Sequence, residues 1–173
     1  AQSWSVLSGG GDSQRCLQAL QSADEHLVRK EIGIIQLFNP PFDKSALNPG
    51  YIQGYVPGVR ENGGQYTHAA IWLVMAFAKI GNSKKTWELL QMINPLNRGN
   101  TPEKLAVYKT EPYVVAADVY AEPLHKGQGG WTWYTGSAGW MYQLIADSFI
   151  GLQKKGNLLG FKPCVPAEWE HYK

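Results

Sequence analysis

Two polar, glycine-rich turns hold the residue types in this sequence that can do chemistry. The first turn, within residues 54–72, places Arg60 and Glu61 a few residues before His68, where an apolar run begins. The second turn, at residues 127–137, also leads directly into an apolar run. A polar turn whose glycines allow unusual backbone conformations, followed by a buried helix, is typical of a functional site. We therefore expect the two turns to face each other across a pocket; a solvated Arg–Glu pair on a loop is the plainer alternative.

The start of the second apolar run has the features of an anion-binding site. Thr135 and Gly136 offer a hydroxyl and free backbone N–H groups at the positive end of a predicted helix dipole. His68, in the first turn of the other predicted helix, can donate to the same anion. We expect that anion to be phosphate. An ordinary helix cap at Thr135 and a core histidine at position 68 are the alternatives.

Several other chemistries are excluded by the sequence. It contains no Walker-type or dinucleotide-binding glycine pattern and no Gly-x-Ser-x-Gly motif. A net charge of +2 with scattered Lys and Arg argues against nucleic acid as a partner. Cys16 and Cys164 lack the spacing of zinc ligands, so we expect no metal, two reduced thiols and a cytoplasmic location. No run reaches the ~18 apolar residues of a membrane span, so any membrane attachment of a parent protein would involve other domains.

The aromatic residues point towards sugar. The sequence has 7 Trp and 9 Tyr, several of them beside glycine or a charged residue. The C–H face of a sugar ring stacks on an aromatic ring while its hydroxyls take polar partners. Core packing accounts for most of these residues, so the aromatic content supports a carbohydrate ligand without identifying its site.

The spacing of apolar residues predicts one mainly α domain, in agreement with an apolar content of 44%. The run at residues 66–80 is apolar on every side, which indicates a helix buried on every side. A helix at 83–95, capped by Ser83, would pair with it as a helical hairpin. Residues 113–120 fit a helix or a buried strand by period alone, and we choose the helix. The expected elements are helices at 1–8, 12–28, 66–80, 83–95, 101–108, 113–120 and 136–155, a long loop within 33–55, and an extended edge strand at 158–166.

Caps and charges set the ends of these predicted helices. Asp12 or Ser13 caps the first long helix, and Thr101 followed by proline starts a short one. Two lysines followed by Gly156 mark the expected end of the last helix, because cations and a glycine both favour a helix C-terminus.

The sequence contains three distinctive motifs: Pro-Gly-Val-Arg-Glu-Asn-Gly-Gly-Gln-Tyr-Thr-His at 57–68, Glu-Pro-Tyr-Val-Val at 111–115 and Gly-Gly-Trp-Thr-Trp-Tyr-Thr-Gly-Ser-Ala-Gly-Trp at 129–140. These motifs make the sequence similar to one enzyme family, the inverting glycoside phosphorylases of the cellobiose and chitobiose type. It most resembles the phosphorylase-like C-terminal region of cyclic β-1,2-glucan synthases, over essentially all 173 residues. The resemblance implies the C-terminal portion of an (α/α)6 barrel with a short β tail, residues 1–156 forming helical hairpins and 157–173 the extended tail.

The resemblance also implies roles for the residues of the two turns. Arg60 and Glu61 match positions that bind the sugar in the donor subsite. The positions that bind phosphate in the family are matched by His68, Thr135 and Gly136. In some members a glutamine after the Glu-Pro-Tyr motif contacts the sugar. This sequence has Ala-Ala-Asp at 116–118 instead, so the resemblance does not imply that contact here.

The implied reaction is a single inverting displacement in which phosphate attacks the anomeric carbon and a carboxylic acid protonates the leaving oxygen. A phosphate nucleophile needs no general base. The family's acid is an aspartate upstream of the first turn, and no residue before Arg60 has its context, so we expect no catalytic residue in this chain. Inorganic phosphate is the co-substrate, and no further cofactor is implied.

The expected function is therefore that of a part of a glycoside phosphorylase or glucan-processing transferase. Its partners would be a β-glucan or β-glucoside oligosaccharide and phosphate. One alternative is a non-catalytic carbohydrate-binding or degenerate module, and another is a six-hairpin hydrolase with a second carboxylate near Glu61. Because part of a barrel leaves helix faces uncovered, we also expect exposed apolar patches or a homo-oligomer.

Overall fold

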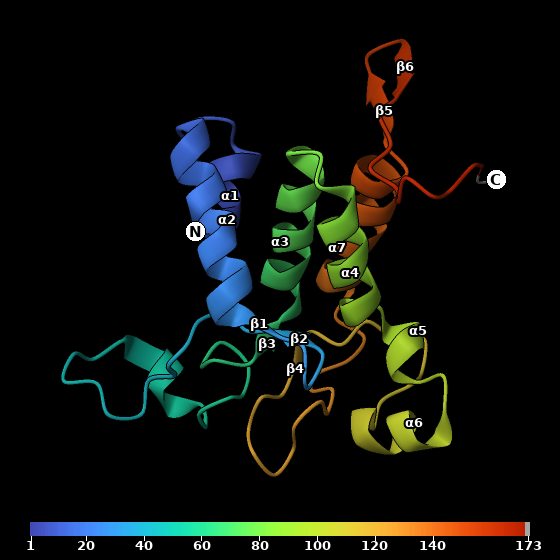
Figure 1. Cartoon of the computed structure of the whole chain (residues 1–173). Helices are drawn as coiled ribbons and strands as arrows, with labels where there is room; N and C mark the ends of the chain where they lie inside the picture. The colour runs from blue at the N-terminus through green and yellow to red at the C-terminus, as the bar shows by residue number, and fades with distance from the viewer. Residues whose placement is uncertain (172–173) are drawn as a thin grey trace.

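The computed structural model describes residues 1–171 and is mainly helical (Figure 1), which confirms the expected class. A 3-10 helix, Gly50–Gly54, lies within the long loop, and a π-helical segment, Leu144–Phe149, follows the last α-helix. The α-helices are α1 Gln2–Leu7, α2 Ser13–Leu27, α3 Thr67–Lys79, α4 Ser83–Ile93, α5 Pro95–Arg98, α6 Pro102–Tyr108 and α7 Thr135–Gln143.

Helix α3 is the centre of the helical layer. In Figure 1 it stands between α2 on one side and α4 and α7 on the other, and it contacts all three as well as α1. Its residues Ile71, Val74 and Ala76 are completely buried. A helix with neighbours on several sides needs apolar residues on all those sides, which is why its sequence shows no polar face.

Within residues 1–171, side-chain caps begin four helices, α2, α4, α5 and α6. Asp12 Oδ1 accepts a hydrogen bond from the Arg15 N–H (2.9 Å), and the Thr101 hydroxyl accepts one from the Lys104 N–H (3.3 Å), both as expected. The cap of α4 is Asn82 rather than Ser83, because Asn82 accepts from the backbone of the first helical turn and Ser83 is already helical. The α3–α4 hairpin forms as expected.

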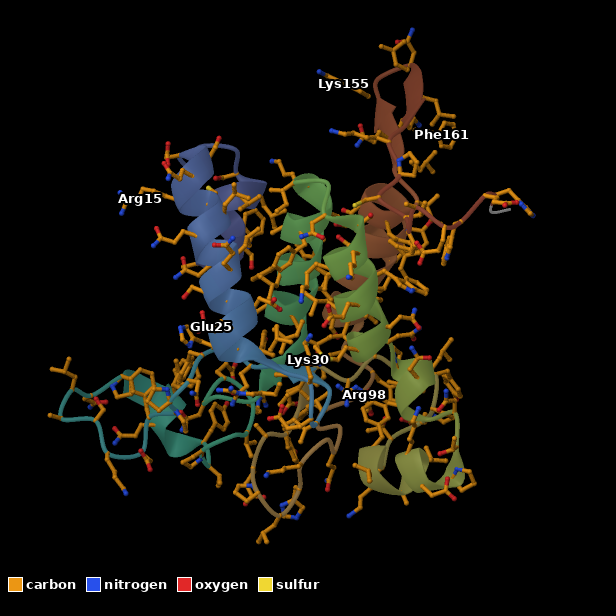
Figure 2. All side chains as sticks on the ribbon, viewed as in Figure 1. Arg15, Glu25, Lys30, Arg98, Lys155 and Phe161 are labelled. Carbon is orange, nitrogen blue, oxygen red and sulfur yellow. The ribbon has the colours of Figure 1, made fainter. Side chains whose placement is uncertain are left out.

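Short antiparallel strand pairs occupy both ends of the helical layer. In Figure 1 the first two pairs gather at one end of the helices, and the third projects from the opposite end. Figure 2 shows Lys155 and Phe161 on this projecting hairpin, and Phe161 is 68% exposed. The pairs are β1 Val28–Arg29 with β2 Ile34–Ile35, β3 Gln65–Tyr66 with β4 Asp118–Val119, and β5 Leu152–Lys155 with β6 Leu158–Phe161.

The helix predicted at residues 113–120 is wrong. The chain turns at 112–113 and then forms strand β4, in which Asp118 pairs with Tyr66. The spacing of apolar residues in this segment is compatible with either a helix or a buried strand. The strand prevails because its hydrogen-bond partner is β3, about fifty residues earlier in the chain, which no local pattern reveals.

The predicted length of the last helix is also wrong. The helical part ends with the π-helical segment before Gly151, and residues 152–155 form strand β5 instead. Gly151 has φ +81°, and a Cβ there would overlap the backbone of Lys162. The close approach of the two strands therefore stops the helix, and the lysines expected at its end lie on the hairpin.

Candidate functional site

The first polar turn is closed by its own backbone. The Gly58 N–H donates to the Asn62 carbonyl oxygen (2.7 Å), and Val59 and Asn62 form an isolated β-bridge. Gly58 has φ +90°, and a Cβ on it would lie 2.5 Å from the backbone nitrogen of Glu122. Only glycine fits this turn against the segment that follows β4.

Asn62 fastens the long loop and has a structural role. Its side chain is completely buried, donates to the carbonyl oxygens of Tyr55 (2.7 Å) and Phe42 (3.1 Å), and accepts from the Phe42 N–H (2.7 Å). Both amide hydrogens and the amide oxygen are therefore in use within the protein. Asn62 thus ties the loop before the turn to the turn itself at two points, Phe42 and Tyr55.

Arg60 is held between two aromatic rings. Its Cζ lies 5.2 Å from the ring centre of Tyr55 and 5.1 Å from that of Trp131, in cation–π geometry. Its Nε lies 3.5 Å from Glu61 Oε2, so the two side chains form an ion pair. The backbone of Arg60 is left-handed, with φ +49°, a conformation that costs a non-glycine residue about 1–2 kcal/mol. The guanidinium is thus fixed in place at some cost to the backbone.

Asp118 is a buried residue between the two turns, and it was not among the predicted site residues. It is 1% exposed, and its Oδ1 accepts a hydrogen bond from the Trp131 N–H (3.1 Å). Burial raises the pKa of Asp118, and the hydrogen bond from Trp131 and the charge of Arg60 oppose that shift. A Cβ on Gly130 would overlap its carboxyl group. The available sequence signal was a lone aspartate within an otherwise apolar run.

His68 lies against the start of α7. A Cβ placed on Gly136 would be 2.7 Å from His68 Nε2, so the glycine lets the imidazole approach the helix backbone. The ring stacks on Tyr66, with ring centres 5.4 Å apart, and meets Trp72 edge-on at 6.3 Å. Burial lowers the pKa of His68, which favours the neutral imidazole at pH 7.

Helix α7 begins at Thr135 without a side-chain cap. The N-cap residue is Tyr134, and it makes no capping hydrogen bond. Gly136 is the second helical residue, so its N–H precedes the i→i−4 ladder and has no partner within the helix. Thr135 and Gly136 are exposed, which leaves the hydroxyl and the first N–H groups open to a ligand.

The residues on either side of β4 bring the two turns together. The Ala117 N–H donates to the Trp131 carbonyl oxygen (2.7 Å), and the Ala117 carbonyl oxygen accepts from Thr67 (2.9 Å), the residue before His68. On the other side, the Ala121 N–H donates to the Gly58 carbonyl oxygen (2.8 Å). The structure therefore places Arg60 and Glu61 beside the second turn and His68 beside Gly136, which is the proximity expected from the sequence.

Several buried polar atoms of this cluster lack a hydrogen-bond partner. They are Arg60 Nε, Glu61 Oε2, His68 Nδ1 and Asp118 Oδ2. An unsatisfied buried donor or acceptor costs about 1–3 kcal/mol, more when it is charged. A ligand rich in hydroxyl or phosphate oxygens has the donors and acceptors that this cluster lacks.

Other features of the described chain place limits on the site. Across residues 1–171, no group of three His, Cys, Asp or Glu side chains is close enough to hold a metal ion. In the same part of the chain, no helix has the length and apolarity required to cross a membrane. A cleft of about 600 Å³ beside Arg98 lies apart from the cluster, and there the guanidinium donates to the Gly33 carbonyl oxygen and lies over the Tyr108 ring.

The sequence matches one family profile and several characterised enzymes. The profile described as glycosyl hydrolase 94 superfamily, catalytic domain, matches residues 1–151. The chain is 48% identical over 172 residues to the cyclic beta-(1,2)-glucan synthase NdvB of Rhizobium meliloti, a match covering 99% of this chain and 6% of that protein. It is 28% identical to the solabiose phosphorylase of Paenibacillus borealis, covering 98% of this chain and 22% of that enzyme.

A third relative is the 1,2-beta-oligoglucan phosphorylase of Listeria innocua, which is 32% identical over 181 residues. That match covers 95% of this chain and 16% of the enzyme. The chain thus spans less than a quarter of the length of each of these three relatives.

The lowered pKa of His68 predicts a specific loss of stability in mild acid. Protonation favours the unfolded chain, where the pKa is near 6.5, so the unfolding free energy should fall as the pH drops below about 6.5 and level off below the folded-state pKa. His68→Gln should flatten this slope in urea titrations at pH 7.5 to 5. His26→Gln, on the exposed side of α2, is the control; an equal slope in wild type and His68→Gln would contradict the prediction.

Removing the Asp118 carboxylate should destabilise the joint between the two turns. Asp118→Ala leaves the Trp131 N–H without its acceptor and should lower the unfolding free energy by about 1–3 kcal/mol. Asp118→Asn keeps an oxygen acceptor and should lose less. Urea unfolding of both variants tests this, and equal losses would show that the hydrogen bond to Trp131 contributes little.

Proposed function

The chain belongs to the glycosyl hydrolase 94 superfamily, and we propose that it forms part of the active site of an enzyme that cleaves or transfers β-linked glucosides by inverting phosphorolysis. The observation that carries the proposal is the contact of His68 with Gly136 at the uncapped start of α7. That contact brings an imidazole to a helix start whose first residues, Thr135 and Gly136, are exposed, in a family whose members include phosphorylases.

Phosphate would bind at the start of α7. The helix dipole and the free N–H groups favour an anion there, and the Thr135 hydroxyl adds a donor. His68 is neutral near pH 7 because of its burial, and a neutral imidazole can still donate one hydrogen bond to a phosphate oxygen. An approaching phosphate dianion would raise the pKa of His68 and strengthen that bond.

The sugar would bind at Arg60 and Glu61. Arg60 Nε and Glu61 Oε2 face each other at 3.5 Å, which holds the two charged groups side by side. A guanidinium donates and a carboxylate accepts, so the pair can hold neighbouring hydroxyls of one sugar ring. Trp131 and Tyr55 keep the guanidinium from swinging away when no sugar is bound.

In the proposed reaction, phosphate at α7 attacks the anomeric carbon from the side opposite the leaving sugar. The nucleophile is already ionised, so a single carboxylic acid that protonates the leaving oxygen suffices. We place that acid outside these 173 residues, together with the helices that would complete an (α/α)6 barrel. The whole enzyme would then use β-glucan or β-glucoside oligosaccharides with inorganic phosphate as co-substrate.

Substitution of Gly136 should disrupt phosphate binding without unfolding the chain. Gly136→Ala puts a Cβ 2.7 Å from His68 Nε2 and forces the ring away from the helix start, so phosphate affinity should fall by tenfold or more. Thr135→Ala removes one donor and should cost about 1 kcal/mol, or roughly fivefold. Calorimetric titration with inorganic phosphate measures both effects.

The matched control for this test lies in the same helix. Gly139 has open space where a Cβ would be, so Gly139→Ala should leave phosphate affinity unchanged. Both glycine variants gain helix propensity, by up to about 1 kcal/mol, so their unfolding free energies should not fall together. Equal phosphate affinities for Gly136→Ala and Gly139→Ala would contradict the assignment of the anion site to the start of α7.

The absence of the acid from this chain predicts binding without turnover. Incubated with β-linked glucosides and inorganic phosphate, the 173-residue protein should release no sugar 1-phosphate above the uncatalysed rate. Chromatography of the products against a glucose 1-phosphate standard checks this. Clear turnover would place the acid within the chain, whereas binding of sugar without any binding of phosphate would favour a non-catalytic carbohydrate-binding module.

A further inference from the structure

Two exposed aromatic rings, one of them from the second turn, lie against each other. Trp133 is 66% exposed and Tyr113 is 64% exposed, and their ring centres lie 6.4 Å apart at an angle of 73°. Neither ring belongs to the hydrophobic core clusters. Exposing large aromatic rings is unfavourable in water, so a fixed exposed pair of this kind is typical of a binding surface.

The position of Trp133 is set by its backbone and by one hydrogen bond. Its φ is +63°, a left-handed conformation that is unfavourable for a bulky residue. The indole N–H donates to Glu111 Oε1 (2.9 Å), and this bond lowers the pKa of Glu111. The one polar group of the side chain is thus used to orient it, which leaves the ring face available for stacking.

A shallow cleft of about 510 Å³ is lined by Pro112 and Thr132, the residues that precede Tyr113 and Trp133 in the chain. Glu111 and Thr132 line it, together with Lys109 and Thr110. Carboxylate, ammonium and hydroxyl groups next to aromatic faces provide both kinds of contact that a pyranose ring makes. The volume is within the range of pockets that hold small ligands.

The cleft and the Arg60 cluster lie on opposite sides of one loop. Gly130 and Thr132 line the cleft, whereas the residue between them, Trp131, packs over Arg60. Trp133 is exposed and follows Thr132 in the chain, so a sugar bound in the cleft can stack on its ring. A ligand that occupied both the cleft and the Arg60 cluster would have to extend across this loop, which a chain of several sugar units can do and a single small molecule cannot.

We propose that Trp133, Tyr113 and the cleft at Glu111 and Thr132 form a second carbohydrate-binding subsite, which holds a distal glucosyl unit of a β-linked oligosaccharide. The inference rests on the proposed function for the identity of the sugar. The subsite makes no contact with the reacting atoms. It would raise the affinity for long chains and leave that for disaccharides unchanged, because only a long chain can occupy both places.

The test compares two oligosaccharides of one linkage, β-1,2-linked glucotetraose and β-1,2-linked glucobiose, on the 173-residue protein. The tetraose should shift the NMR signal of the Trp133 indole N–H, identified by its loss in Trp133→Phe, and the biose should not. Tyr113→Ala should weaken tetraose binding about three- to tenfold and leave biose binding unchanged. Tyr142→Ala removes a tyrosine that is 74% exposed on α7, and it should change neither affinity.

The outcomes separate this subsite from the proposed function. If Tyr113→Ala binds the tetraose as wild type does, if the Trp133 signal stays still while the tetraose binds, or if the tetraose does not bind, the subsite is refuted. The first two results leave the proposed function intact. If the tetraose binds at Trp133 while Gly136→Ala leaves phosphate affinity unchanged, the subsite stands and the proposed phosphorolysis fails.

Discussion

Residues 117–121 are the segment on which the geometry of the site depends. Ala117 bonds through its backbone to both Thr67 and Trp131, and Ala121 bonds to Gly58. The pairing of β3 with β4 lies between these contacts. Because the bonds are made by backbone groups, they fix the spacing of the two turns whatever side chains the turns carry. The contact of Arg60 with Trp131 and that of His68 with Gly136 therefore both follow from the backbone hydrogen bonds of residues 117–121.

The charges of the site are arranged so that each depends on its neighbours. Arg60 opposes the rise that burial causes in the pKa of Asp118, whereas the negative charge of Glu61 adds to it. The rings of Tyr55 and Trp131 fix the guanidinium without consuming its hydrogen-bond donors. Donors and acceptors that are oriented but unused suit a ligand that supplies many weak polar contacts, as a sugar does.

Local sequence signals predicted most of the helices and failed where a distant contact decides the structure. The caps at Asp12 and Thr101 gave the starts of α2 and α6 because capping is a contact within one turn. Strand β4 and the end of the last helix were missed because each is decided by a distant partner. For the site, the closeness of His68 to Gly136 could be expected, since each begins an apolar helix. Asp118 was missed as a site residue because only the packing of the two turns reveals what its carboxyl group holds.

The left-handed backbone of Arg60 has a consequence for how this protein can change. Glycine adopts that conformation without strain, so replacement of Arg60 by glycine would remove a backbone penalty of about 1–2 kcal/mol while losing two cation–π contacts of roughly 0.5–1 kcal/mol each. The same substitution would leave the half-buried Glu61 carboxylate without its ion-pair partner and would remove the positive charge that offsets the burial of Asp118. Replacement of Arg60 by glycine should therefore lower the stability of the protein despite the relief of backbone strain. Folding itself thus selects for a cation at this position, and a screen for stability alone would already detect its loss.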